Sequence, residues 1–386
     1  MGDRMNESMK QIIGNMEKHN KHLSIFATKD EEAIRLNPIN EDIRPPFFRD
    51  IDKVLYSLSY FRYADKTQVF SFQDNDMISK RMTHIQLVSK IARTIGRGLN
   101  LNEDLIEAAG LGHDLGHVPF GHVGEKILNK LSERYSEGYF YHNVQSVRTL
   151  MNIEGNGEGN NITIQVLDAI LCHNGEKVLQ IYEPKKKTSE EFLREYNDCY
   201  TNKEMLKNLT PMTLEGCVVR ISDVVAYIGR DIEDAIRLGK ITIEDLPISI
   251  KKILGNKNSE IINTIVLDII KNSIGKNYIK ISDNIYNSLQ KLLDFNYKNI
   301  YLLSYSKEEL KNIENMFNKL FELYYIQIIN KETDEDIYKI YLNTMCDNYN
   351  ENTTPARKVI DYIAGMTDNF FIQQYNKYFV ECVNKE

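Results

Sequence analysis

The segment GLGHDLGHVPFGHVGE, residues 110–125, contains His113, His117 and His122, although the whole chain has only eight histidines. Asp114 follows the first of them directly, and Glu125 ends the segment. Imidazole and carboxylate groups are common ligands of divalent metals, and they also carry protons in catalysis near neutral pH. The composition of this segment therefore indicates a metal site, acid–base catalysis, or both.

A helix is predicted over residues 81–99, RMTHIQLVSKIARTIGRGL, because its apolar residues recur at helical spacing. His84 shares a stripe with Val88 and Ile95, so its side chain is predicted to face inward. A single histidine in such a position is usually a core residue with a hydrogen-bond partner. Whether His84 is a ligand depends on what the neighbouring helices bring beside it.

The next helix is predicted to begin after Asn102, a residue type that caps helices, and to end at Pro119. His113 and Asp114 would lie near the end of this helix, with His117 one turn beyond His113 on the same side. A face that allows another backbone to approach closely would be formed by Leu105, Ala109, Gly112 and Gly116.

A third helix is predicted over residues 218–236, and its polar side chains share one face: Asp223, Tyr227, Arg230, Asp231 and Asp234. By itself this pattern is typical of a helix face in contact with water. Across the three helices, however, two imidazoles and two carboxylates form a set suited to Mg, Mn, Fe, Co or Zn. No thiolate is among the candidates, which disfavours a purely structural zinc site. The set is His84, His113, Asp114 and Asp223.

The composition is that of a globular protein with a sizeable core: 386 residues, 42% hydrophobic and 27% charged. The formal net charge of −7 argues against a chain-wide nucleic-acid footprint and leaves only a local basic patch open. Five cysteines form no CxxC pair, and no apolar stretch is long enough to span a bilayer. These observations predict a soluble cytoplasmic protein that does not enter a membrane.

Apolar residues recur at helical spacing nearly throughout the chain, which predicts an all-α fold. We expect an N-terminal arm at residues 1–46, a core at 47–240 and a helical extension at 241–386. Polar and glycine-rich segments predict loops at 155–161, 183–191, 254–260 and 348–355. The three consecutive lysines within the second of these loops, residues 185–187, are predicted to be solvated.

Several strings carry a resemblance to a known family. The pattern H…HD…D, filled by the four candidate ligands, resembles the HD phosphohydrolase superfamily. Longer strings resemble its deoxynucleoside triphosphate triphosphohydrolases, the dGTPase family, from about residue 47 to 240 and again from 357. This resemblance implies an HD-domain helical core with a helical C-terminal extension. The strings are FFRDIDKVLYSLSYFRYADKTQVF (47–70), RMTHIQLVSKIAR, HDLGHVPFGHVGE, YHNVQSVR (141–148), ISDVVAY and RKVIDYIAGMTD (357–368).

The resemblance implies that water attacks the α-phosphorus of a deoxynucleoside triphosphate (dNTP), releasing deoxynucleoside and intact triphosphate. Because the departing 5′-oxygen needs a proton, His122 is expected to act as acid and base, with Glu125 orienting its ring. Glu125 alone is equally typical of the first turn of a helix. His117 and His142 are expected to contact the α-phosphate or the attacking water. Mg²⁺ or Mn²⁺ is the expected cofactor, with Fe, Co and Zn as alternatives, and its implied ligands are His84, His113, Asp114 and Asp223.

The triphosphate needs local positive charge in a chain whose net charge is negative, although single basic residues are more often surface ion-pair partners. Expected contacts are Lys66, Arg81, Tyr227 and Arg357, the last in a block near 357–368. Gln68 resembles the family position that reads the sugar 3′-hydroxyl, a role that suits an amide. The remaining substrate-contacting candidates are Asn143, Asp231 and Tyr362.

Three residues depart from the family pattern: Val118 replaces a proline, and Tyr141 and Ser222 each replace an acid. All ligand positions are nonetheless filled. Two alternatives stay open, an HD phosphohydrolase acting on another nucleotide or phosphoester, and a nucleotide-sensing or nucleic-acid-binding regulator with little turnover. Similar proteins are usually homo-oligomers, and an allosteric nucleotide is a further expected partner beside the dNTP substrate.

Overall fold

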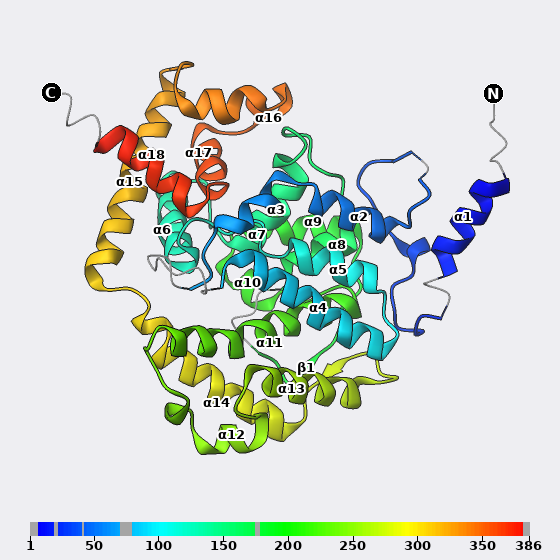
Figure 1. Cartoon of the computed structure of the whole chain (residues 1–386). Coiled ribbons are helices and arrows are strands. Elements are labelled where there is room, and N and C mark those ends of the chain that lie inside the picture. Colours follow the sequence, from blue (N-terminus) through cyan, green and yellow to red (C-terminus); the bar gives the residue numbers. More distant parts are fainter. Residues whose placement is uncertain (1–6, 19–21, 41, 70–78, 174–177, 381–386) are drawn as a thin grey trace.

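The computed structural model describes residues 7–18, 22–40, 42–69, 79–173 and 178–380 (Figure 1). It confirms the all-α prediction, because within these ranges the only sheet joins two strands of two residues each. Strand β1, Ile181–Tyr182, pairs antiparallel with β2, Ile279–Lys280, in the register Ile181 to Lys280. The helices and the turns that join them therefore position the candidate site.

The helices of the first two thirds of the chain include the long helix α11, which packs against α4, α5 and α8, whereas α1 lies at the edge of the molecule (Figure 1). Their bounds are α1 Glu7–Glu17, α2 Pro46–Leu55, α3 Leu58–Arg62, α4 Arg81–Leu99, α5 Glu103–Gly112, α6 Gly121–Arg134, α7 His142–Arg148, α8 Ile164–Leu171, α9 Ser189–Asp198, α10 Lys203–Asn208 and α11 Leu214–Arg237. The remaining helices are α12 Ile248–Leu254, α13 Asn258–Ser273, α14 Asp283–Asn299, α15 Lys307–Ile329, α16 Asp347–Asn352, α17 Pro355–Ala364 and α18 Asp368–Phe379.

Two hydrophobic clusters organise these helices. The first contains buried residues from Ala27 to Ile300, so α12–α14 pack under α11 as part of the same core. The second joins α6 to α15, α17 and α18, which stand together at one side of the molecule (Figure 1). The clusters thus cross the division of the chain expected at residue 240. Leu115 belongs to the first cluster, whereas Val118 and Phe120 belong to the second, so the loop of residues 113–120 passes from one cluster to the other.

The polar face predicted for residues 218–236 is covered rather than solvated. Helix α11 packs against α4, α5 and α8, and also against α13 and α14. Asp223, Asp231 and Asp234 are consequently buried, and Tyr227 and Arg230 are half-buried. The buried carboxylates are tolerated because they have partners, for example the hydroxyl of Tyr301, which donates to Asp231 Oδ2 at 2.6 Å.

The helix that was predicted to contain His113 ends just before this residue. Asn102 caps its start through its side-chain oxygen, but α5 stops at Gly112, well before Pro119. A turn follows, and within it Gly116 lies so close to α7 that a Cβ there would be 2.3 Å from the backbone nitrogen of Ser146. The predicted close approach is therefore present at Gly116, and it places the turn directly against the helix that begins at His142.

The predicted solvated lysine loop is wrong at one position. Lys187 is buried, and its ammonium group lies 2.6 Å from carboxylate oxygens of both Asp168 and Glu195. The preceding Lys186 is exposed, as expected. The loop thus inserts one charge into the core, where the carboxylates beneath it attract it. The predicted loop at 348–355 is likewise interrupted, since residues 347–352 form α16.

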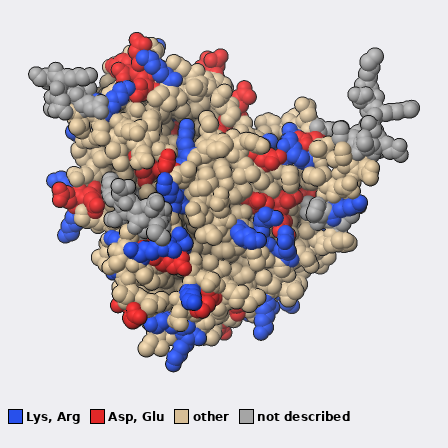
Figure 2. Space-filling view, in the orientation of Figure 1, with Lys and Arg blue, Asp and Glu red and all other residues tan. Residues whose placement is uncertain are grey.

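Cys172, Cys199 and Cys217 are buried thiols, whereas Cys382 lies outside the described residues. Among the helices of the described ranges, none combines the length and the apolar character that crossing a membrane would require. On the face shown in Figure 2, acidic and basic side chains are interspersed, so no single patch of one sign dominates it.

Candidate metal centre and active site

The four predicted metal ligands come together from three elements. His84 lies in the first turn of α4, His113 and Asp114 follow the end of α5, and Asp223 lies in the middle of α11. Asp223 Oδ1 lies 3.0 Å from His84 Nε2 and 3.7 Å from His113 Nε2. Asp114 lies 3.5 Å from His113 Nε2 through Oδ1 and 3.9 Å from His84 Nε2 through Oδ2. Separations of this size suit donors that share one ion bound at about 2.1 Å.

The hydrogen bonds of His113 prepare it to bind a metal. Its Nδ1 lies 2.8 Å from the carbonyl oxygen of Gly110, a bond that places the proton on Nδ1 and the lone pair on Nε2. Nε2 is buried and has no hydrogen-bond partner among the described residues. A buried imidazole nitrogen aimed at two carboxylates fits a divalent cation, so the residues present fit the expected cofactor.

The two carboxylates are held ionised. Burial alone would raise the pKa of Asp114, but His113, His117 and the guanidinium of Arg81 lower it well below its usual value. Burial is likewise outweighed at Asp223, whose pKa is lowered by the hydrogen bond with His84. Both carboxylates are therefore ready to bind a cation at neutral pH.

A second group of side chains is organised by Glu125, which lies in α6. Its carboxylate lies 3.1 Å from His122 Nδ1 and 3.0 Å from His142 Nδ1, so it orients two rings rather than one. His122 is 62% exposed, whereas His142 is 13% exposed. Burial lowers the pKa of His142, but Glu125 outweighs it and raises this pKa to about 9. The sequence analysis predicted the contact between His122 and Glu125, but it did not predict that Glu125 also bonds to His142.

His117 joins the two groups. Its ring stacks on that of His142 with centroids 4.1 Å apart, and its Nε2 lies 3.5 Å from Asp114 Oδ1. Burial, followed by the charges of Arg81 and His142, lowers the pKa of His117 well below its usual value. A neutral imidazole in this position can accept or donate a hydrogen bond to a ligand between the two groups.

Sequence reasoning missed His173, which lies just beyond the end of α8. Its Nε2 lies 3.2 Å from His142 Nε2 and 3.7 Å from Asp114 Oδ1, and its ring contacts that of His113. Burial is the first of the causes that lower the pKa of His173 to about 3. Six of the eight histidines of the chain thus gather at one place. One feature of the sequence could have indicated this role for His173: like His113, it directly follows an apolar helix.

Several predicted substrate contacts lie near these histidines. The guanidinium of Arg81 donates to Asp114 Oδ2 and to the carbonyl oxygen of Thr67. Gln68, which follows Thr67 in the chain, is half-buried, and its Oε1 has no hydrogen-bond partner among the described residues. Tyr227 and Asp231 lie one and two turns beyond Asp223 on α11, and burial raises the pKa of Asp231 to about 7.

The other predicted substrate contacts are engaged elsewhere. Asn143 donates from Nδ2 to the carbonyl oxygen of Leu171 at 2.7 Å and so fastens α7 to α8. Lys66 is buried, and its ammonium group donates to the carbonyl oxygens of His117 and Ala364. Arg357 pairs with Glu137 and lies over the ring of Tyr200. In this conformation these side chains hold the framework of the site together.

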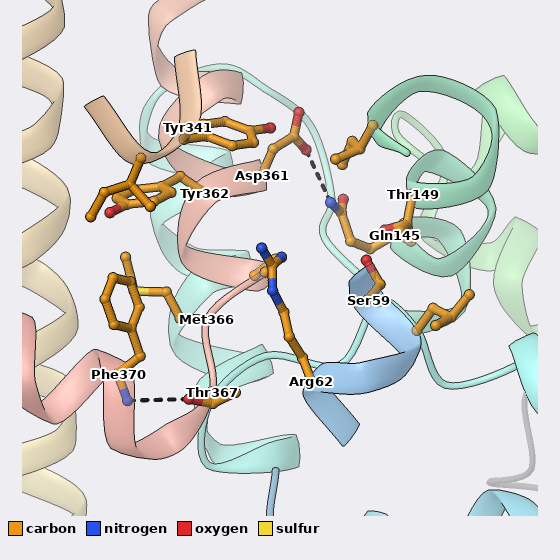
Figure 3. A pocket seen from close by; sticks show the side chains of 16 residues that line it. Ser59, Arg62, Gln145, Thr149, Tyr341, Asp361, Tyr362, Met366, Thr367 and Phe370 are labelled. Carbon is orange, nitrogen blue, oxygen red and sulfur yellow. Dashed lines mark hydrogen bonds between the residues drawn. The ribbon is translucent and has the colours of Figure 1, made fainter. Parts of the chain in front are cut away.

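Tyr362 lies at a cavity of about 280 Å³ rather than among the histidines (Figure 3). Leu115 and Gly116, which directly follow Asp114, are among the residues that line this cavity. The side chain of Arg62 points into its middle. The ring of Tyr362 stacks on Tyr341 with centroids 5.4 Å apart. None of the six clustered histidines is among the residues that line the cavity.

Comparisons with known proteins agree with this arrangement. The family model of the HD domain matches residues 81–228, and that of a phosphohydrolase-associated domain matches residues 279–377. The chain is 38% identical to a deoxyguanosinetriphosphate triphosphohydrolase-like protein of Caldanaerobacter subterraneus subsp. tengcongensis, over 93% of both chains. Proteins of the same name from Clostridium perfringens strain 13 and Clostridium tetani are 38% and 33% identical, covering 93% and 97% of this chain and 94% and 97% of their own. The chain therefore belongs to the family of deoxyguanosinetriphosphate triphosphohydrolase-like HD-domain proteins.

Proposed function

We propose that this protein is a metal-dependent hydrolase that cleaves a dNTP, with dGTP as the first candidate, into deoxynucleoside and triphosphate. The observation that carries the proposal is the convergence of a four-residue metal-ligand set with two histidines oriented by one buried glutamate. The names of the relatives support the choice of nucleotide. The same site would also serve another nucleotide or phosphoester, and product analysis separates these cases.

We assign each of the clustered residues a separate part in this reaction. His84, His113, Asp114 and Asp223 would hold the cation. When bound, such a cation polarises a phosphoryl oxygen and lowers the pKa of water. Arg81, which lies on Asp114, keeps that carboxylate ionised and in place. Because His117 is held neutral between Asp114 and His142, it can orient the α-phosphate or the attacking water by hydrogen bonding.

His122 is the proposed general acid and base. It is the most exposed of the clustered histidines, which leaves its ring accessible to a substrate, and Glu125 fixes its Nδ1. The opposite nitrogen, Nε2, would then give a proton to the departing 5′-oxygen. His142, bound to the same glutamate, stands between this acid and the metal ligands.

The direct test is product identification. The full-length protein is incubated with each dNTP and either Mg²⁺ or Mn²⁺, and the products are separated by ion-exchange chromatography. Triphosphate together with deoxynucleoside is the expected pair. Release of single phosphate or of pyrophosphate would contradict the proposal, as would tight nucleotide retention without turnover, which is the signature of a sensing protein.

Replacing Gln68 with alanine is expected to weaken turnover of every dNTP. Its buried, unpartnered Oε1 is proposed to accept a hydrogen bond from the sugar 3′-hydroxyl. Losing a hydrogen bond to a buried partner costs about 1 to 3 kcal/mol, which corresponds to a drop in kcat/KM of roughly 5- to 150-fold. Steady-state kinetics with dGTP and with 3′-deoxy-dGTP measure this. Unchanged kinetics on every dNTP would refute the assignment of Gln68.

Ribonucleotides are expected to be poorer substrates than deoxynucleotides. Tyr227 is half-buried one turn after the ligand Asp223, where its ring is proposed to close the side of the sugar pocket that a 2′-hydroxyl would occupy. The ratio of kcat/KM for dGTP over GTP is the relevant measurement, and Tyr227→Ala is expected to reduce it. Equal rates for GTP and dGTP in the unaltered protein would contradict this prediction.

A further inference from the structure

Asp368 is the first residue of α18, and its side chain is buried. A buried carboxylate needs hydrogen-bond donors in place of water. The donors that reach Asp368 belong to two segments far from it in the chain, and both segments carry residues of the proposed active site. One segment leads to Gln68, and the other leads to His122.

Thr67 connects the first segment to Asp368. Its backbone N–H and its hydroxyl group donate to Asp368 Oδ2, at 3.3 and 2.5 Å respectively. The preceding Lys66 is fastened nearby, because its ammonium group donates to the carbonyl oxygen of Ala364 at 2.9 Å. The chain directly before Gln68 is thus held by the end of α17 and the start of α18.

Phe120 connects the second segment to Asp368. Its backbone N–H donates to Asp368 Oδ1 at 3.1 Å. Its φ of 61° lies in the left-handed region, which is unfavourable for a residue other than glycine, so the surroundings must hold this conformation. Its ring packs against that of Phe371 in α18, with centroids 5.6 Å apart. His122 follows two residues later in the first turn of α6, so α18 holds the turn from which this side chain extends.

The two segments also lie against each other. A Cβ atom on Gly121 would be 3.5 Å from the carbonyl oxygen of Gln68 and from Nη2 of Arg81. The same guanidinium nitrogen donates to the carbonyl oxygen of Thr67 at 3.3 Å. A shift of either segment would therefore disturb the other, and Asp368 bonds to both.

One carboxylate therefore joins the two segments, with Oδ1 on Phe120 and Oδ2 on Thr67. In the proposed function, Gln68 binds the 3′-hydroxyl of the substrate and His122 protonates its departing 5′-oxygen. Both oxygens belong to one sugar, so the two side chains must keep a fixed separation. We propose that Asp368 is a positioning residue that sets this separation. The inference rests on the proposed function, from which the roles of Gln68 and His122 are taken.

Replacing Asp368 with alanine in the full-length protein tests the proposal, because both segments then lose their acceptor. We expect kcat/KM for dGTP to fall about 10²-fold, since a misplacement of about 1 Å can have an effect of this size. For 3′-deoxy-dGTP the fall should be smaller, because this substrate has no 3′-hydroxyl for Gln68 to bind. The ratio of the two kcat/KM values should thus shrink, while the metal content stays that of the unaltered protein.

Asp336→Ala is the matched control. Asp336 also holds α18, but near the other end of the helix, through Gln374 Nε2 at 3.0 Å and Lys377 Nζ at 2.6 Å. A general loosening of α18 would affect both variants, whereas a positioning role affects only Asp368→Ala. An equal fall for both substrates in Asp368→Ala, or the same change of ratio in Asp336→Ala, would overturn the proposal.

Thr67→Val separates the two segments with a smaller change. It removes the hydroxyl donor of the first segment and leaves the bond from Phe120 to Asp368 in place. We expect kcat/KM for dGTP to fall roughly 2- to 10-fold and that for 3′-deoxy-dGTP to stay the same. An unchanged ratio in this variant would overturn the link to Gln68, even if Asp368→Ala does not fold.

Hydrogen exchange measured by mass spectrometry gives a readout that needs no turnover. In Asp368→Ala the amides of Thr67 and Phe120 lose their acceptor, so peptides that contain them should exchange faster than in Asp336→Ala. Unchanged exchange in both peptides would overturn the proposal. Faster exchange, together with no release of triphosphate by the unaltered protein, would instead contradict the proposed function and leave the link through Asp368 standing.

Discussion

Replacing His113 with alanine is expected to remove bound metal and to lower thermal stability together. The change deletes the buried Nε2, which has no hydrogen-bond partner among the described residues and lies near both ligand carboxylates, together with the Nδ1 bond to Gly110. Asp114 and Asp223 would then lie beside each other without His113, whose ring is one of the groups that lower the pKa of both, and with less bound cation to offset their repulsion. Elemental analysis and a thermal melt, each with and without added Mn²⁺, measure the two effects, and the gap in melting temperature caused by Mn²⁺ should shrink.

Replacing His122 with alanine is expected to separate catalysis from metal binding. His122 is largely exposed and bonds to Glu125, so its loss leaves the metal ligands intact. The rate should fall roughly 10²- to 10⁴-fold while the metal content stays that of the unaltered protein. Exposed His22 offers a matched control, since His22→Ala removes an imidazole outside the cluster and should change neither quantity.

Two outcomes would contradict this division of labour. Loss of metal from His122→Ala, to the extent seen in His113→Ala, would make His122 a ligand. Nearly full activity in His122→Ala would move the proton donor to His117 or His142. Because Glu125 holds both His122 and His142, Glu125→Ala should be at least as slow as His122→Ala, and the double variant should be no slower than Glu125→Ala.

Replacing Lys187 with methionine is expected to cost the largest amount of stability away from the site. The change would leave the carboxylates of Asp168 and Glu195 without the cation that lies 2.6 Å from each. Removing one partner of a buried ion pair lowers the free energy of unfolding by about 3–5 kcal/mol. Urea unfolding, followed by circular dichroism, measures the loss as a shift in the midpoint.

The neighbouring lysine provides the control for this prediction. Lys186 is exposed, so Lys186→Met should change the free energy of unfolding by no more than about 0.5 kcal/mol. Combining Lys187→Met with Asp168→Asn should recover part of the loss, because one uncompensated buried charge is then removed. A midpoint for Lys187→Met equal to that of Lys186→Met would show that the buried pair contributes little.

The local sequence determined where helices form and which functional side chains lie together within a single helix or turn. Apolar spacing placed His84 on the inward stripe of a helix, and adjacency in the chain placed Asp114 beside His113. The three-residue spacing brought Glu125 to His122 within the first turns of one helix. These relations depend on the geometry of a single helix or turn, which a short stretch of sequence dictates by itself.

Tertiary packing decided the relations between distant segments. Glu125 meets His142, and His142 meets His173, because Gly116 lets the turn after α5 lie against α7 while Asn143 fastens α7 to α8. Similarly, Lys187 is buried because two carboxylates from other elements lie beneath its loop, although its local sequence is that of a solvated one. Such contacts form between surfaces whose relative placement depends on the packing of the whole core, and no local spacing encodes that placement.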